Sequence, residues 1–214
     1  RRVGGRRASR AMQTAMDTDT APATKTRDAD GRTPLHHAAI TGDIEVIAKL
    51  LAQGADIEAV DDAKWTPLIC AASAGRAGAV ALLLHSNAAV NARTATGTTA
   101  LTHAAGKGHL DVVNALLAAG ADATVQDHSG SSALHRSAGV GAAEVLRALC
   151  VAAPRSALEL VDKLGCTPFH VAVEERREAC VMVLAEAGAN IRCKNSAGEV
   201  ALESVPARIR EQIE

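Results

Sequence analysis

The side chains with the most potential for chemistry in this chain are histidines and cysteines. Cys166 and His170 stand four residues apart, so on one helix a thiol and an imidazole would lie on the same face. A catalytic thiolate also needs an electropositive setting and an oriented base. We therefore favour the alternative, in which Cys166 faces a turn and His170 has a structural role.

Three histidines share one place in a recurring phrase, and these are His36, His135 and His170. An imidazole at this position is expected to join a hydrogen-bond chain that ties a turn to the next helix. The other histidines do not share a helical spacing with a cysteine or carboxylate that suggests a closed zinc shell. The glycines form neither G-x-G-x-x-G nor G-x-x-x-x-G-K. The sequence predicts no enzyme, no cofactor and no metal.

The phrase that carries these histidines recurs at a nearly constant step. Its copies begin at Thr33, Thr66, Thr99, Ser132 and Thr167, so the steps are 33, 33, 33 and 35 residues. Such a period is typical of a unit too thin to bury its own apolar face, which must stack on copies of itself. The sequence therefore predicts a solenoid.

Each unit carries the signals of two short helices. Thr33 can cap an inner helix that Pro34 opens, and Gly42 suits the left-handed end of that helix. An outer helix follows, with apolar residues at helical spacing, and it stops at Gly54. The remaining residues of the unit are expected to form an extended hairpin finger that leads into the next unit.

This period, together with the Thr-Pro-Leu-His phrase, resembles the ankyrin repeat. The resemblance implies an all-α ankyrin-repeat solenoid with a helix-turn-helix plus a β-hairpin finger in each 33-residue repeat. Residues 28–214 would form this domain. We place its repeats at about 28–60, 61–93, 94–126, 127–161 and 162–194, followed by a partial C-terminal capping repeat at 195–214.

Residues 1–27 show no apolar period and are predicted to be a disordered arm. Five arginines lie in the first ten residues, and they are Arg1, Arg2, Arg6, Arg7 and Arg10. Two alternatives stay open. The stretch is either an organelle transit segment, or the true start of the protein is Met12 or Met16.

Composition agrees with thin helical layers and excludes several classes of function. The chain is 48% hydrophobic but only 1% aromatic, so its interior must be alanine, leucine and valine. A net charge of −1 without a basic stripe argues against nucleic-acid binding. No apolar run approaches the roughly 20 residues that a membrane span needs. Five cysteines without a C-x-x-C pair indicate reduced thiols in the cytoplasm or nucleus.

A solenoid of this kind also predicts where a protein partner binds. Finger tips and the exposed side of the inner helices align into one concave strip. Along it we expect Asp30, Arg32, Asp62, Lys64, Trp65, Arg76, Lys107, Arg136, Glu174, Glu175 and Arg176. The strip carries charges of both signs. Trp65 is the single tryptophan and is either an interface anchor or a residue packed between neighbouring fingers.

Several non-consensus phrases are similar to the gankyrin family of proteasome assembly chaperones over about residues 24–205. They are Asp62-Ala63-Lys64-Trp65, Ser73-Ala74-Gly75-Arg76 and Glu174-Glu175-Arg176. The resemblance implies a chaperone that holds the C-terminal domain of one ATPase subunit of the 26S proteasome regulatory particle during assembly of the base. It also implies that Asp30, Arg32, Asp62 and Lys107 pair with opposite charges on that domain.

The chain departs from the gankyrin family in two places. Residues 1–27 lack the helix pair of a further N-terminal repeat, so either the chain is truncated or misjoined, or its first unit begins uncapped. An uncapped face at Leu35 and Ile47 is expected to be an exposed apolar patch. Val171 to Glu175 also lacks the leucine and cysteine of the family's Leu-x-Cys-x-Glu motif, so that tumour-suppressor activity is not transferred.

Two other functions compete with a proteasome chaperone. One is a general ankyrin-repeat adaptor with an unrelated protein partner, because repeats alone never reveal the partner. The other is an ankyrin protein imported into an organelle, for which the arginine-rich start is the reason. In each case we expect a monomer that binds protein rather than nucleic acid or membrane.

Overall fold

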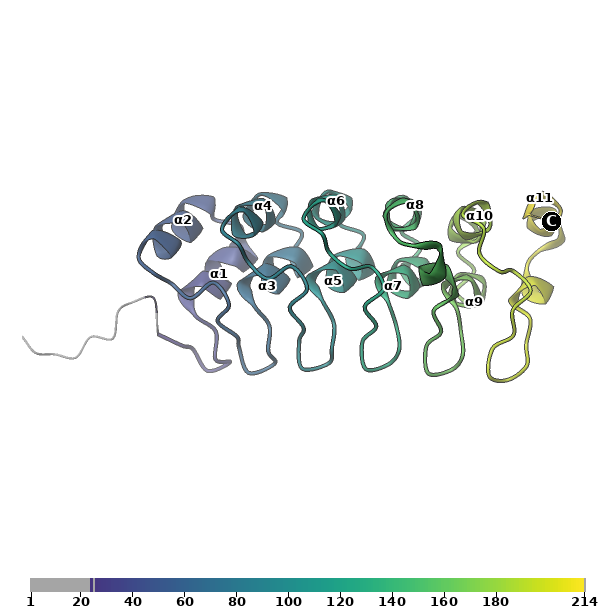
Figure 1. Ribbon diagram of the computed structural model, residues 1–214, viewed down its shortest axis with the longest axis horizontal. Coiled ribbons are helices and arrows are strands. Elements are labelled where there is room, and N and C mark those ends of the chain that lie inside the picture. The colour runs from purple at the N-terminus through teal and green to yellow at the C-terminus, as the bar shows by residue number, and fades with distance from the viewer. Residues whose placement is uncertain (1–23, 25, 214) are drawn as a thin grey trace, which may run out of the picture.

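The computed structural model describes residue 24 and residues 26–213, and they form a row of stacked helix pairs (Figure 1). Most of the predicted arm at 1–27 lies outside the described residues. The helices form two layers, with a loop at the base of each unit that points away from both (Figure 1). The all-α solenoid predicted from the period is confirmed.

The layer next to the loops contains the inner helices. They are α1 (Pro34–Thr41), α3 (Pro67–Ser73), α5 (Ala100–Lys107), α7 (Ala133–Val140) and α9 (Pro168–Glu174). The second layer contains the outer helices α2 (Ile44–Ala52), α4 (Ala77–His85), α6 (Leu110–Ala118), α8 (Ala143–Ala152) and α10 (Glu178–Glu186). Each inner helix packs on its own outer helix and on the inner helices of adjacent units.

Two departures from the regular period have local causes. A short 3-10 helix, η2 (Arg155–Glu159), follows Pro154 in the fourth unit and takes up the two extra residues there. In the sixth unit the finger is followed by another 3-10 helix, η3 (Ala201–Ser204), and then by α11 (Ala207–Ile213). The last inner helix of the regular kind is therefore α9.

The inner helices begin where the Thr and Ser residues of the repeated phrase predict. Thr66 is the N-cap of α3 in extended conformation, and its Oγ1 accepts a hydrogen bond from the backbone N–H of Ile69 at 3.3 Å. Pro67 occupies the first turn, where its missing N–H leaves no bond unmade. Four of the inner helices end near a glycine at positive φ, as predicted, and the residues are Gly42, Gly75, Gly108 and Gly141.

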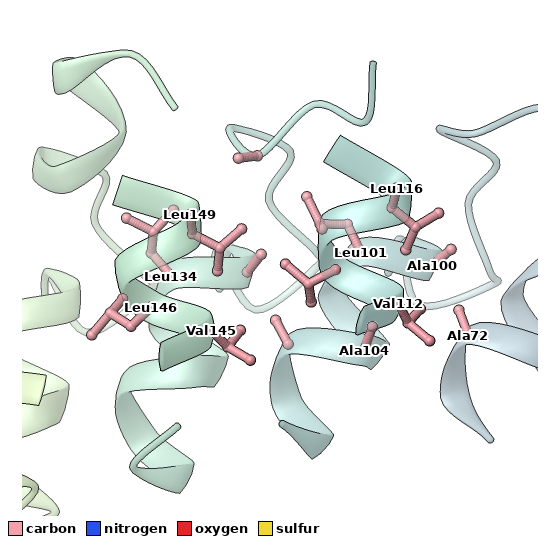
Figure 2. Close-up of a cluster of buried hydrophobic side chains, with 14 of the residues drawn as sticks. Ala72, Ala100, Leu101, Ala104, Val112, Leu116, Leu134, Val145, Leu146 and Leu149 are labelled. Atoms are coloured by element: carbon pink, nitrogen blue, oxygen red, sulfur yellow. The ribbon is translucent and has the colours of Figure 1, made fainter. Parts of the chain in front are cut away.

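The core runs without a break between the two helix layers (Figure 2). Leucines of inner and outer helices meet there, and Leu101 of α5 and Leu116 of α6 are both fully buried. Alanines such as Ala104 lie where inner helices of neighbouring units approach one another. The predicted alanine, leucine and valine interior is confirmed, and Phe169 is its one buried aromatic residue in the described part of the chain.

The prediction of an exposed apolar patch at Leu35 and Ile47 of the first unit is wrong. Leu35 and Ile47 are 1% and 0% exposed, because they lie in the layer that α1 and α2 share with the second unit. The large apolar residues that α2 exposes are instead Ile44 and Val46, at 42% and 41%.

Candidate protein-binding surface

Each finger is a tight turn folded by one acceptor side chain. Asp61 Oδ1 accepts hydrogen bonds from the backbone N–H groups of Ala63 at 3.0 Å and Trp65 at 2.8 Å. The same double acceptor recurs at the start of the other fingers, in Asp28, Thr94, Asp127, Asp162 and Asn195. Among the described residues the one β-bridge joins Lys194 to Val200, so the predicted hairpins are turns rather than strands.

Neighbouring fingers are joined by one backbone hydrogen bond each. The N–H of Asp62 donates to the carbonyl of Asp30 at 3.1 Å, and the N–H of Ala95 donates to the carbonyl of Ala63 at 2.9 Å. Equivalent bonds continue to the sixth finger. The finger tips are therefore held at fixed separations, which makes them a rigid support for any side chain that they carry.

The predicted strip residues differ in how far their side chains are exposed to solvent. Most are exposed, and these are Asp30, Asp62, Lys64, Arg76, Lys107, Arg136, Glu174, Glu175 and Arg176. Arg32 and Trp65 are partly buried. The finger tips carry Asp30, Asp62 and Lys64, and Arg76 is the N-cap of the outer helix α4. The remaining exposed charges lie on the inner helices or just after their C-terminal ends.

Two of the predicted arginines hold carboxylates at the base of a finger. Arg136 Nη2 donates to Asp127 Oδ2 at 2.6 Å, and Arg32 Nε lies 3.4 Å from Asp61 Oδ2. Burial favours a higher pKa for Asp127, but hydrogen bonds from Ser129 and Arg136 outweigh it and lower the pKa to about 2. Part of each arginine's charge is thus already compensated within the protein.

Arg76 connects two units. Its Nε donates to the carbonyl of Ile40 in the first unit at 3.0 Å, and its side chain covers the positive-φ residue Gly42. Arg177 makes the corresponding bond to the carbonyl of Gly139, also at 3.0 Å. The repeated geometry gives Arg76 a part in joining the first and second units, in addition to its exposure on the surface.

Trp65 lies against the third unit. Its ring stacks on the imidazole of His103 from α5, with centroids 4.4 Å apart and the planes tilted by 42°. Burial, then the nearby charges of Lys107 and Arg136, lower the pKa of His103 to about 4. The imidazole is therefore neutral at pH 7, and its Nε2 lies 3.0 Å from the Thr98 hydroxyl. The Trp65 ring thus packs against a neighbouring unit and is also partly exposed to solvent, because it is only half-buried.

Two hollows lie along this surface. One, of about 730 Å³, is lined by His103, Lys107, Arg136, Val140 and Lys163 among others. The other, of about 930 Å³, lies between the fifth and sixth units. Sequence reasoning missed His103, Val140 and Lys163. Alignment of the units offers a signal for Val140, since it stands eight residues after its helix cap, as Lys107 does.

Cys166 and His170 do not form a nucleophile and base. Burial, then the charges of Asp162 and Glu174, raises the pKa of the Cys166 thiol. The backbone carbonyl of Cys166 accepts a hydrogen bond from His135 Nε2 at 3.0 Å. His170 Nδ1 accepts from the Thr167 N–H at 3.2 Å. Cys166 and His170 thus have structural rather than catalytic positions. His170 caps α9, but its Nε2 has no partner among the described residues, so the predicted tie to the next finger is wrong for this histidine.

All five cysteines are free thiols, and burial raises the pKa of each one. Within the described part of the chain, no group of three His, Cys, Asp or Glu residues is arranged to hold a metal ion. None of the described helices is both long and apolar enough to span a bilayer.

Comparison with known proteins shows to which family this chain belongs. A model of the family described as ankyrin repeats (3 copies) matches residues 13–94, 42–127 and 101–195. The chain belongs to the ankyrin repeat family. A 35-residue segment is 54% identical to Ankyrin repeat domain-containing protein 49 of Homo sapiens. That segment is 16% of this chain and 15% of that relative, so the chain spans only a small part of the relative's length.

Family membership gives the class of function. Ankyrin repeats are protein–protein interaction modules and are generally non-catalytic. The class of function that family membership supports is therefore protein binding.

Proposed function

We propose that this ankyrin repeat protein is an assembly chaperone of the 26S proteasome regulatory particle. In this proposal the strip defined above binds the C-terminal domain of one base ATPase subunit, in the cytoplasm or nucleus. Two features support the proposal. One is the similarity of residues 24–205 to the gankyrin family, and the other is the exposure of three of the four charged residues that this similarity singles out, Asp30, Asp62 and Lys107.

The observation that carries the proposal is a row of exposed charges of both signs on successive rigid units. Asp30 and Asp62 project from fingers that are hydrogen-bonded to each other. Lys107 lies at the end of α5 with its charge exposed. Exposed pairs of this kind contribute about 0 to 1 kcal/mol each and govern the rate and selectivity of association more than its tightness. Such a row suits recognition of a folded domain with a complementary charge pattern.

A binding experiment tests the proposal directly. The purified chain is mixed with the C-terminal domain of each proteasome ATPase subunit, and complexes are measured by gel filtration. We expect a one-to-one complex with one of the domains. The fluorescence of Trp65, which is half-buried beside His103, gives a second measurement in a titration. Absence of a complex with every domain would favour an adaptor with an unrelated partner.

Charge variants test the strip itself. Reversing Arg32 and Lys107 together should weaken the complex and flatten its salt dependence. Because Arg32 also pairs with buried Asp61, a second variant with Asp62→Lys and Lys107→Glu keeps the net charge and spares that pair. We expect a loss of affinity of about tenfold or more.

The matched control carries Glu144→Lys and Lys49→Glu on the exposed side of the outer helices, and it should bind like the parent. Equal binding by the strip variants and the control would contradict the proposed surface. Fusion of residues 1–27 to a reporter tests the competing import function, since accumulation of the reporter in an organelle would oppose a cytoplasmic or nuclear chaperone.

A further inference from the structure

The hollow between the fifth and sixth units owes its shape to the irregular last unit. In the regular units a finger is followed at once by an α-helix with a Thr or Ser cap, whereas the sixth finger leads into η3 through Val200. The hollow of about 930 Å³ lies over α9 and beside the sixth finger. Its lining includes Cys166, His170, Glu174, Glu199 and Glu203.

His170 is among the residues that line this hollow, and its ring carries a buried nitrogen without a hydrogen-bond partner. The Thr167 N–H donates to His170 Nδ1 at 3.2 Å, so Nδ1 is an acceptor and the ring proton is assigned to Nε2. His170 is 5% exposed, yet its Nε2 has no hydrogen-bond partner among the described residues. A buried N–H without an acceptor is unfavourable by about 1–3 kcal/mol, so a ligand that supplies an acceptor gains affinity.

The equivalent histidines show what this donor is placed to contact. His36 Nε2 lies 2.9 Å from the carbonyl of Trp65, and His135 Nε2 lies 3.0 Å from the carbonyl of Cys166. In both cases the acceptor is a backbone carbonyl of the next finger. A peptide carbonyl is therefore the group that satisfies this donor elsewhere in the same molecule.

The charges around the hollow select the rest of the ligand. Glu174, Glu199 and Glu203 are exposed on its rim, against a single lysine, Lys163, among the residues that line it. Glu174 and Glu203 form no ion pair within the described part of the chain. The neutral Cys166 thiol adds no charge of its own. A cationic side chain is attracted to this rim and an anionic one is repelled.

We propose that this hollow binds one arginine or lysine residue in an extended segment of a partner protein. Its backbone carbonyl accepts a hydrogen bond from His170 Nε2, and its cationic side chain lies among Glu174, Glu199 and Glu203. The site goes beyond the proposed chaperone function, because a short peptide is sufficient to test it whether or not an ATPase domain binds the strip.

Histidine imidazole NMR on the full chain labelled with ¹⁵N-histidine tests the site. The probe is the peptide acetyl-Gly-Arg-Gly-amide, and the His170 signals are identified by their loss in His170→Gln. We expect the Nε2 nitrogen and its proton to shift, with saturation in the millimolar range that suits a ligand of one residue. His170 signals that stay unchanged up to about 10 mM peptide would overturn the proposal.

Two further ligands separate the two parts of the recognition. Acetyl-Gly-Glu-Gly-amide keeps the carbonyl groups and reverses the charge, so it should bind at least about tenfold more weakly. Agmatine keeps the guanidinium and lacks a peptide carbonyl, so it should leave the His170 Nε2 proton nearly unshifted. Equal responses to the arginine and glutamate peptides would contradict the role of the acidic rim.

Rim variants complete the test without touching the buried imidazole. Glu174→Gln with Glu203→Gln should weaken binding of the arginine peptide by about tenfold. The control, Glu45→Gln with Glu144→Gln, makes the same change of charge on exposed outer helices and should bind like the parent. Equal affinities of the two double variants would show that the rim does not select the ligand and would overturn the proposal.

Discussion

The fourth-to-fifth junction and the fifth-to-sixth junction contain the same cap but differ in what the imidazole contacts. At the first, His135 accepts from the Ser132 N–H at 3.2 Å and its Nε2 reaches the Cys166 carbonyl at 3.0 Å. At the second, His170 accepts from the Thr167 N–H at the same distance, but its Nε2 meets no partner among the described residues. One junction is closed and the other is open.

The cause of the difference lies in the unit that follows. The fifth finger is followed by Thr167, which caps α9, so the finger carbonyl is brought over His135. The sixth finger is followed by Val200, whose side chain offers no acceptor to cap a helix, and η3 forms instead. The histidine of the repeated phrase thus either bonds to the next finger or lines a hollow, depending on the unit that follows it.

The largest effect is expected from removal of the two imidazoles. His135→Ala should lower the free energy of unfolding by about 2–3 kcal/mol, because it leaves the Ser132 N–H and the Cys166 carbonyl without their buried partner. His170→Ala removes only the cap and should lower it by about 1 kcal/mol. Urea unfolding measures both, and equal losses would contradict the distinction between closed and open junctions.

Acid should weaken the junctions that hold a neutral histidine. Burial, then Lys107 and Arg136, lowers the pKa of His103 from an ordinary 6.5 to about 4, and burial also lowers the pKa of His135. As the pH falls from 6.5 towards 4, these histidines become protonated in the unfolded chain but stay neutral in the folded chain. The free energy of unfolding therefore falls. For His103, discounted for its partial exposure, the loss is about 1–2 kcal/mol.

Urea midpoints at pH 7.5 and pH 5, followed by Trp65 fluorescence, measure this loss. In His103→Gln the contribution of His103 disappears, so the difference between the two pH values should shrink. A variant that keeps the full difference would assign the acid sensitivity to other groups.

The smallest effect concerns the backbone where each inner helix ends. Arg176 has a φ of 56°, in the left-handed region, whereas Gly141 holds the corresponding place at the closed junction with a φ of 83°. Arg176→Gly should stabilise the protein by about 0.5–1 kcal/mol, and Gly141→Ala should destabilise it by about 1 kcal/mol. Thermal unfolding measures both. Changes of the same sign at the two sites would show that packing, rather than backbone strain, sets these energies.

Sequence reasoning was most successful for features that each unit specifies locally. The Thr66 cap, the helix opened by Pro67 and the positive-φ glycine Gly75 follow from residue types at short spacing. The exposure of Lys107 and Asp62 also follows, because their places in the unit face outward. The role of the strip in binding a particular partner stays a prediction.

Contacts between units could not be predicted in the same way. Arg76 reaches the carbonyl of Ile40, and Arg32 lies beside Asp61, across 36 and 29 residues of sequence. Each contact depends on the offset between two stacked units, which no residue type specifies alone. For the same reason the expected patch at Leu35 and Ile47 was wrong, since the packing of α1 and α2 on the second unit buries both.

The sequence by itself determined the repeat, the two helices of each regular unit and the places where they begin and end. It did so because caps, prolines and glycines act over a few residues and recur with the period. The tertiary structure alone decided that His103 is held neutral beside Trp65, and that His135 finds a carbonyl while His170 does not. Burial and hydrogen-bond partners arise from surfaces about thirty residues apart, so phrases of the same pattern acquire different chemistry only once the units are stacked.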